Sequence, residues 1–213
     1  MLETSRKISF PQALRVVSEE TGSGVTAGQS SGMRVLTTAL GSYGVELWGA
    51  MPVGWLCNFT RGATRSGLDI ARGSARRDAR GIWFARFELH SQSGDAQDID
   101  YLALGREKAP DVPLPPLLIE AFTLEREADR PGALALRVRA HDRVGLLASL
   151  LDHVAGFVLF PEQILIETLR GEAHDVLWLS SVGGEAPPTS LETALQSSLS
   201  ACLNRRISYR PLQ

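Results

Sequence analysis

The chain has 213 residues, of which 44% are hydrophobic and 22% are charged. This composition is typical of a globular protein with one large or two small domains. The formal net charge of −2 gives no overall basic surface for nucleic acid. Two cysteines are too few for a disulfide scaffold and indicate a reducing compartment. Residues 1–10 lack the apolar core of a signal peptide, and no apolar run reaches the roughly 18 residues of a membrane span.

Residues 1–43 form an extension of unclear structure. Residues 9–12 resemble a capping box that opens a short helix. Residues 22–31 are rich in glycine and serine and predict a flexible loop. This loop is only loosely similar to a phosphate-binding loop, because no Lys-Ser/Thr pair closes it. Residues 33–40 suit either a strand or a helix.

Residues 44–127 predict a first structural unit. Residues 45–50 alternate like a strand, and apolar residues at helical spacing then continue to Gly67, which is suited to end a helix. Strands follow over 68–77 and 82–91. After a proline-rich stretch, residues 117–127 are interpreted as the last strand of this unit.

Residues 133–213 repeat the same order of elements. A strand alternates from Leu134 to Ala140, a turn follows over 142–145, and a helix with one apolar face begins at Leu146. Strands over 159–169 and 175–182 come next, and a capping box at 189–192 opens another helix. Ile207 and Tyr209 alternate in a short final strand.

The order strand–helix–strand–strand–helix–strand therefore occurs twice, and a shift of 91 residues places Gly54 on Gly145. This order predicts an α+β protein of two ferredoxin-like βαββαβ sandwiches, each with helices on one face of an antiparallel sheet. Two such units commonly cover their free edges or faces by pairing side by side or face to face.

The most informative stretch is residues 136–151, a strand that ends in a charged turn before a helix. The first amides of a helix are unpaired and attract carboxylates. Asp142 either caps these amides or holds an ammonium group. A loop with both charges at the start of a helix predicts a pocket for an amino acid.

The turn Asp142-Arg143-Val144-Gly145-Leu146-Leu147 resembles the Asp-Arg-Pro-Gly-Leu-Leu turn of the ACT-domain family, with valine in the proline position. Strands 164–168 and 172–178 match the later family signature. The nearest subtype is similar to the paired C-terminal ACT domains of the uridylyltransferase that modifies the nitrogen-regulatory PII protein. Tandem ACT proteins related to the repressor of glycine cleavage are also similar. The resemblance implies that an amino acid or another small effector binds between paired domains, at residues 142–147.

The first unit matches the family less well. Residues 51–56 keep the glycine and the hydrophobic pair but lack the aspartate and the arginine, so this unit looks like a degenerate copy. Residues 129–132 spell Asp-Arg-Pro-Gly, a closer match in letters, but a strand follows them rather than a helix.

No residue pattern predicts a catalytic centre or a metal site. Cys57 and Cys202 occupy apolar helical positions, which indicates buried thiols. The four histidines are too scattered for a catalytic set, and no serine lies in a Gly-x-Ser-x-Gly turn. Residues 80–87 partly resemble an RNA-recognition signature, in which Phe84 and Phe87 fit but Ile82 and Trp83 do not.

We therefore expect a cytoplasmic, non-enzymatic regulatory protein that forms a homodimer. It consists of an extension (1–43), a degenerate ACT-like unit (44–127) and an ACT-type unit (133–213). The expected effector is an amino acid bound allosterically at Asp142–Leu147, with no cofactor, metal, membrane or nucleic acid involved. The alternatives are a dimerisation module without a ligand, an RNA-binding ferredoxin-like protein, and an enzyme built on the same sandwich.

Overall fold

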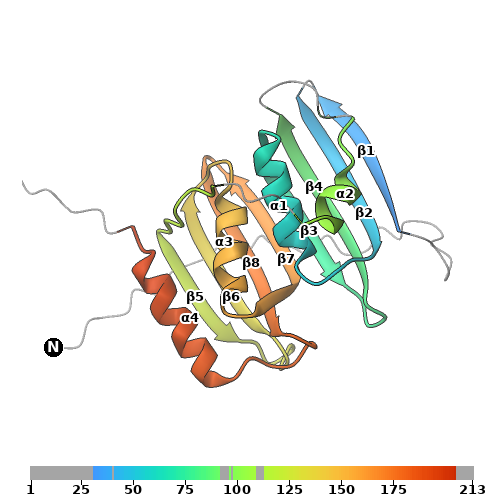
Figure 1. Ribbon diagram of the computed structural model, residues 1–213. Helices are drawn as coiled ribbons and strands as arrows, with labels where there is room; N and C mark the ends of the chain where they lie inside the picture. Colours follow the sequence, from blue (N-terminus) through green and yellow to red (C-terminus); the bar gives the residue numbers. More distant parts are fainter. Residues whose placement is uncertain (1–30, 40, 92–95, 97, 109–112, 205–213) are drawn as a thin grey trace, which may run out of the picture. The chain divides into compact units, whose positions relative to one another are not determined.

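A computed structural model describes residues 31–39, 41–91, 96, 98–108 and 113–204. Over this part, the chain folds into one antiparallel sheet that carries helices on one face (Figure 1). The helix and loop predicted within residues 1–30 lie outside the described residues. So does the predicted final strand around Ile207 and Tyr209.

Two similar series of elements make up the fold. The first half contains β1 (Gly32–Ala39), β2 (Ser42–Ala50), α1 (Trp55–Arg65), β3 (Leu68–Arg77), β4 (Ile82–Ser91) and α2 (Tyr101–Arg106). The second half contains β5 (Ala121–Arg126), β6 (Leu134–His141), α3 (Leu146–Ala155), β7 (Leu159–Leu169), β8 (Glu172–Ser181) and α4 (Thr189–Ala201).

The strand order is β1-β2-β4-β3-β7-β8-β6-β5. Each half contributes four neighbouring strands, and the halves join where β3 pairs with β7, with Ala75 opposite Ile164. All pairings between these strands are antiparallel. The arrangement is a mixed α/β fold compatible with two ferredoxin-like units that share one sheet. Pairing side by side leaves neither β3 nor β7 with a free edge.

The outer strand of each half differs from the sequence prediction. Residues 117–127 were assigned to the end of the first unit, but β5 pairs with β6, from Ala121 opposite Arg139 to Arg126 opposite Leu134. Likewise β1, from within the predicted extension, pairs with β2. Each half thus runs ββαββα. A short connection joins β5 to β6, whereas a helix and a proline-rich linker separate β4 from β5, and short loops cost less entropy to close.

The core lies between the helices and the sheet face that they cover. Alternate residues of the central strands point into it, as the period of two requires. Among these side chains, Leu47, Phe87, Leu89, Leu134 and Leu136 are nearly inaccessible to solvent. Helices α1 and α3 lie side by side over the junction of the halves (Figure 1), where Arg61 pairs with Asp152.

Two helix starts depart from the sequence prediction. At α4, the cap residue is Pro188 and no side chain caps the helix, so the capping box predicted at Thr189 does not form. The repeated order predicted a second helix in the first unit without placing it. This helix is α2, which Asp100 caps by accepting a hydrogen bond from the amide of Ala103 at 3.0 Å. None of the described helices is long and apolar enough to span a membrane.

Candidate functional site

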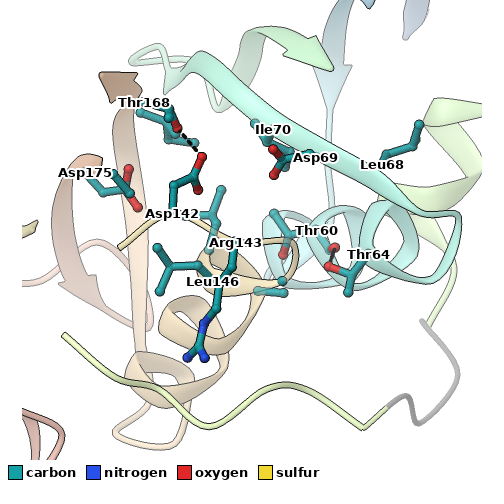
Figure 2. A pocket seen from close by; sticks show the side chains of 15 residues that line it. Thr60, Thr64, Leu68, Asp69, Ile70, Asp142, Arg143, Leu146, Thr168 and Asp175 are labelled. Atoms are coloured by element: carbon teal, nitrogen blue, oxygen red, sulfur yellow. Dashed lines mark hydrogen bonds between the residues drawn. The ribbon is translucent and has the colours of Figure 1, made fainter. Parts of the chain in front are cut away.

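A small pocket lies between α1 and α3, above the junction of β3 and β7 (Figure 2). Its cavity volume is about 20 Å³, which is room for one ordered water. With its open mouth the empty space is about 360 Å³. The lining comes from both halves: Thr60, Thr64, Leu68, Asp69 and Ile70 from the first, and Asp142, Arg143, Gly145, Leu146, Leu147, Ala148, Ile166, Thr168, Ala173 and Asp175 from the second. Of the six predicted site residues, only Val144 does not line it.

The first turn of α3 supplies the backbone groups of the pocket. Gly145 precedes the helix with a left-handed backbone, φ 85°, and no side chain caps the helix. The amide of Leu146 donates to the carbonyl of Arg143, and that of Ser149 donates to Gly145. Within the described chain, the amides of Leu147 and Ala148 have no backbone acceptor. These two amides are the unpaired donors that a helix start presents to an anion.

Asp142 does not serve as the cap of α3. Its carboxylate oxygen Oδ2 instead accepts a hydrogen bond from the hydroxyl of Thr168 at 2.8 Å, and the cap position belongs to Gly145. Of the two roles that the sequence left open for Asp142, the structure thus removes capping. The side chain lies in the pocket, held by β7 from the same half (Figure 2).

The guanidinium of Arg143 points away from the three aspartates of the pocket (Figure 2) and donates to the carbonyl of Pro116. The neighbouring Pro115 accepts a hydrogen bond from the hydroxyl of Ser149 at 2.8 Å. The linker before β5 is therefore fastened to the start of α3. Arg143 acts on this linker rather than on a ligand in the pocket.

Three carboxylates, from Asp69, Asp142 and Asp175, point into the same space from three different elements (Figure 2). Burial, and secondly the charge of Asp142, raises the pKa of Asp69. Asp175 is only 3% exposed, and its Oδ1 has no hydrogen-bond partner in the described chain. Burial, and secondly the charge of Asp142, raises the pKa of Asp175 to about 7.

The site predicted from the sequence did not include Asp69, Asp175 or the threonines of the pocket. A signal for Asp175 was present, because it lies in the apolar phase of β8 between Ala173 and Leu177, where a hydrophobic residue is expected. No comparable signal marks Asp69 and Thr60. Asp69 reaches the pocket through the pairing of β3 with β7, and Thr60 reaches it through the packing of α1 against α3. Both depend on contacts between the halves.

The corresponding place in the first half holds a different hollow. Gly54 precedes α1 with φ 78°, and the cavity beside it, about 90 Å³, is lined in part by Met51, Trp55, Trp83 and Phe160. The acidic residue in its lining, Glu162, pairs with Arg77 at 2.7 Å. This hollow lacks the aspartate and arginine of the turn in the second half, as the sequence indicated.

The RNA-recognition signature is divided between the two faces of the sheet. Trp83 is 6% exposed and packs edge to face against Trp55 on the helix-covered side, at 5.2 Å between ring centroids. Phe84 points to the opposite face, where Trp48 and Arg76 are its neighbours. Trp83 is therefore a core residue and has no free ring face on which a base could stack.

The remaining candidate residues do not assemble a reactive centre in the described part of the chain. No group of three or more His, Cys, Asp or Glu side chains there is arranged to hold a metal ion. Cys57 and Cys202 are both free thiols. Burial raises the pKa of each, which opposes thiolate formation. His153 contacts the hydroxyl of Ser198 at 3.1 Å, and burial lowers the pKa of this histidine.

No family model matches the chain, and neither does any curated protein sequence. Among solved structures, the crystal structure of an aspartate kinase from Synechocystis is similar over 76% of this chain, with 16% sequence identity and a TM-score of 0.44. The chain covers 27% of the kinase chain. A likeness this distant carries no argument about function.

Proposed function

We propose that this protein is a non-catalytic regulatory protein that binds a small amino acid at the junction of its two ACT-type halves. One observation carries the proposal: unpaired amides of Leu147 and Ala148 and the carboxylate of Asp142 line one pocket. A helix start binds a carboxylate, and a carboxylate binds an ammonium group. An amino acid presents both groups at a short separation.

In the proposed complex, the ligand carboxylate accepts hydrogen bonds from the amides of Leu147 and Ala148. Its ammonium group faces the aspartates on the other side of the pocket. The cavity of about 20 Å³ is smaller than any amino acid, so the side chains of Thr64 and Leu146 must move outward when a ligand enters. Such an opening favours the smallest amino acids, because each further carbon requires more displacement of packed neighbours.

Binding at this place couples the ligand to the pairing of the halves. Thr60 and Asp69 belong to the first half and Asp142 to the second, so a ligand held by all three stabilises their junction. A ligand can shift an equilibrium only by its difference in affinity for the two states. The proposed regulatory signal is therefore a tighter β3–β7 junction. A homodimer and a cytoplasmic location belong to this proposal.

Isothermal titration calorimetry of the full chain against each of the twenty amino acids at pH 8 tests the proposal. We expect heat from one or a few of the smallest, and loss of that heat in Asp142→Asn. Asp129→Asn is the matched control, because Asp129 is exposed on a turn outside the pocket. No heat from any amino acid at this pH would overturn the proposal.

A second candidate, an interaction module without a ligand, is favoured by the small size of the cavity and by the linker that covers Gly145. The double variant Asp142→Ala, Arg143→Ala distinguishes the two candidates. In a pure interaction module, sedimentation equilibrium gives the same association state for the variant and the original protein, with or without amino acids. In a sensor, an amino acid changes the association or stability of the original protein alone.

A further inference from the structure

We propose that Asp175 receives the ammonium group of the ligand, and that binding to the protonated form of this carboxyl group expels its proton to the solvent. The inference rests on the proposed function and specifies the chemistry of the same pocket. It makes the protein a receptor for small primary amines that also carry a carboxylate. The same pocket rejects carboxylic acids that lack an amine.

The charges that line the pocket are not balanced. Three carboxylates line it, whereas Arg143, the one cationic residue among the described lining residues, directs its guanidinium to Pro116 outside. The other lining residues of the pocket are uncharged. Thr60 and Thr64 come from α1, Thr168 comes from β7, and α3 contributes Leu146, Leu147 and Ala148. A cation from outside the described chain is the missing partner.

Asp175 is itself buried without a full set of hydrogen-bond partners. This side chain is 3% exposed, lies on the helix-facing side of β8, and leaves Oδ1 without a partner. Burial of an unpaired carboxylate is costly, so the group keeps its proton or pairs with a cation. Val138 and Ile166 flank it on the neighbouring strands, and neither can pair with it. Asp175 is thus a buried acid for which keeping the proton is the alternative to pairing with a cation.

The proton balance follows from these two states. In the empty pocket the carboxyl group of Asp175 is protonated below pH 7, because burial and the charge of Asp142 raise its pKa to about 7. An arriving ammonium group stabilises the carboxylate instead. The carboxyl O–H bond breaks, the proton leaves to solvent, and an N–H···O hydrogen bond to the ammonium forms. No oxidant, reductant or further reactant takes part.

Affinity must then depend on pH in a defined direction. Below the pKa of the empty site, binding has to expel a proton, so affinity falls as the pH falls. With an empty-site pKa of about 7, the dissociation constant at pH 6 should be about tenfold higher than at pH 8. The expelled proton should be nearly stoichiometric at pH 6 and nearly absent at pH 8. Asp69 senses the same charge of Asp142 but also faces His90, which opposes its shift.

The experiment is calorimetric titration with glycine and with alanine at pH 6, 7 and 8, in two buffers with different ionisation enthalpies. The difference in heat between the buffers counts the protons released. Methylammonium chloride and sodium acetate are titrated separately. We expect weak binding of methylammonium that depends on pH in the same way, and no binding of acetate at pH 8.

Asp175→Asn replaces the acid by a neutral side chain of the same shape. We expect it to bind glycine or alanine roughly 10- to 100-fold more weakly at pH 8, since a hydrogen bond to a charged group is lost. It should release no proton at any pH. Asp129→Asn is the matched control and should keep both the affinity and the proton release. Circular dichroism melting of each variant verifies folding, and the comparison of pH profiles for the original protein stands even if Asp175→Asn fails to fold.

The outcomes separate the two proposals. If glycine or alanine binds with the same affinity at pH 6 and pH 8 and releases no proton, the role of Asp175 is overturned while the proposed function stands. The role of Asp175 is also overturned if Asp175→Asn binds the amino acid with the pH profile of the original protein. The same holds if acetate binds as tightly as glycine. If no amino acid binds even at pH 8, the proposed function falls and this inference falls with it.

Discussion

Gly54 and Gly145 occupy the same place in the two halves of the protein, each directly before a helix and each with a left-handed backbone, φ 78° and 85°. Their surroundings differ. A Cβ atom on Gly54 would meet only Phe160, at 3.8 Å. One on Gly145 would meet Pro115 at 3.0 Å and Thr64 at 3.1 Å. The repeated turn is therefore covered by the linker and by α1 only in the second half.

This difference predicts the effect of a methyl group at the pocket. Gly145→Ala should lower the free energy of unfolding by about 2–3 kcal/mol, because it adds both backbone strain and two close contacts. Gly171→Ala is the matched control, since Gly171 has φ 80° and no neighbouring atom within 4 Å. This control variant should lower the free energy of unfolding only by the backbone strain, about 1 kcal/mol. Urea denaturation measures both, and equal losses would mean that the contacts at Gly145 are not constraining.

The elements of each half could be predicted because their signals are local. The strand at Leu68–Arg77 and the strand at Leu159–Leu169 have the bounds that alternation indicated. Left-handed glycines and turns supply the ends of these elements. The strand that pairs with β5 could not be predicted from such local signals, because the alternating pattern of residues 121–126 fits either outer edge of the sheet equally well. Its pairing depends on the length of the connecting chain rather than on the residues of the strand.

The candidate site was predictable in part for the same reason. The turn Asp142–Leu147 carries its own signal, an acidic residue and a glycine before an apolar helix. Asp69 becomes a neighbour of Asp142 only when β3 pairs with β7. The residue sequences of these two strands do not specify that they pair with each other. When a site lies between two halves, its residues cannot be predicted from the sequence pattern of either half alone.

The stability of the protein should depend on pH through Asp175. The carboxyl pKa in the folded state, about 7, lies above the value of about 4 in an unfolded chain. Between these two values the folded state holds a proton that the unfolded state has lost. The free energy of unfolding should therefore fall as pH rises from about 4 to 7, by up to roughly 1.4 kcal/mol per unit, and level off above.

Urea denaturation of the original protein and of Asp175→Asn at pH 5 and pH 8 measures this contribution. Asparagine does not titrate, so the free energy of unfolding of the variant should not fall with pH through this position. From pH 5 to pH 8 it should therefore rise by about 2 kcal/mol or more relative to that of the original protein. Any fixed cost of the buried amide cancels in that comparison. If the two proteins differ by the same amount at pH 5 and pH 8, Asp175 does not titrate in the folded state as the structure indicates.

Glu127 should contribute to stability with the opposite dependence on pH. Burial opposes its ionised form, but the indole of Trp178, which donates to Oε2 at 2.8 Å, and the guanidinium of Arg137 together lower its pKa. Glu127→Gln should lower the free energy of unfolding by about 1–2 kcal/mol at pH 7. Stability from a lowered pKa is present above the unfolded value and is lost as pH falls through the folded one. At pH 3 the free energies of unfolding of the variant and the original protein should thus become similar.

Glu125→Gln is the control for this prediction. Glu125 also faces Arg137, at 3.7 Å, but its side chain is 63% exposed, and exposed ion pairs contribute little. We expect Glu125→Gln to change the free energy of unfolding by less than about 0.5 kcal/mol at both pH 7 and pH 3. Thermal or urea denaturation of both variants at pH 7 and pH 3 gives the comparison. A larger loss for Glu125→Gln than for Glu127→Gln would contradict the partnership of Glu127 with Trp178.

Cys57 should be nearly inert in the folded protein. Its thiol lies between α1 and α3 with Sγ 3.7 Å from the carbonyl of Leu151. Burial first, and then the charge of Asp152, raises its pKa to about 11. Only the thiolate reacts with disulfide reagents. In Cys202→Ser, which leaves Cys57 as the one remaining thiol, Ellman's reagent at pH 8 should react slowly with the native protein and rapidly in denaturing urea. Native labelling as fast as that of the unfolded chain would show that α1 and α3 separate readily, and that the junction is looser than its packing indicates.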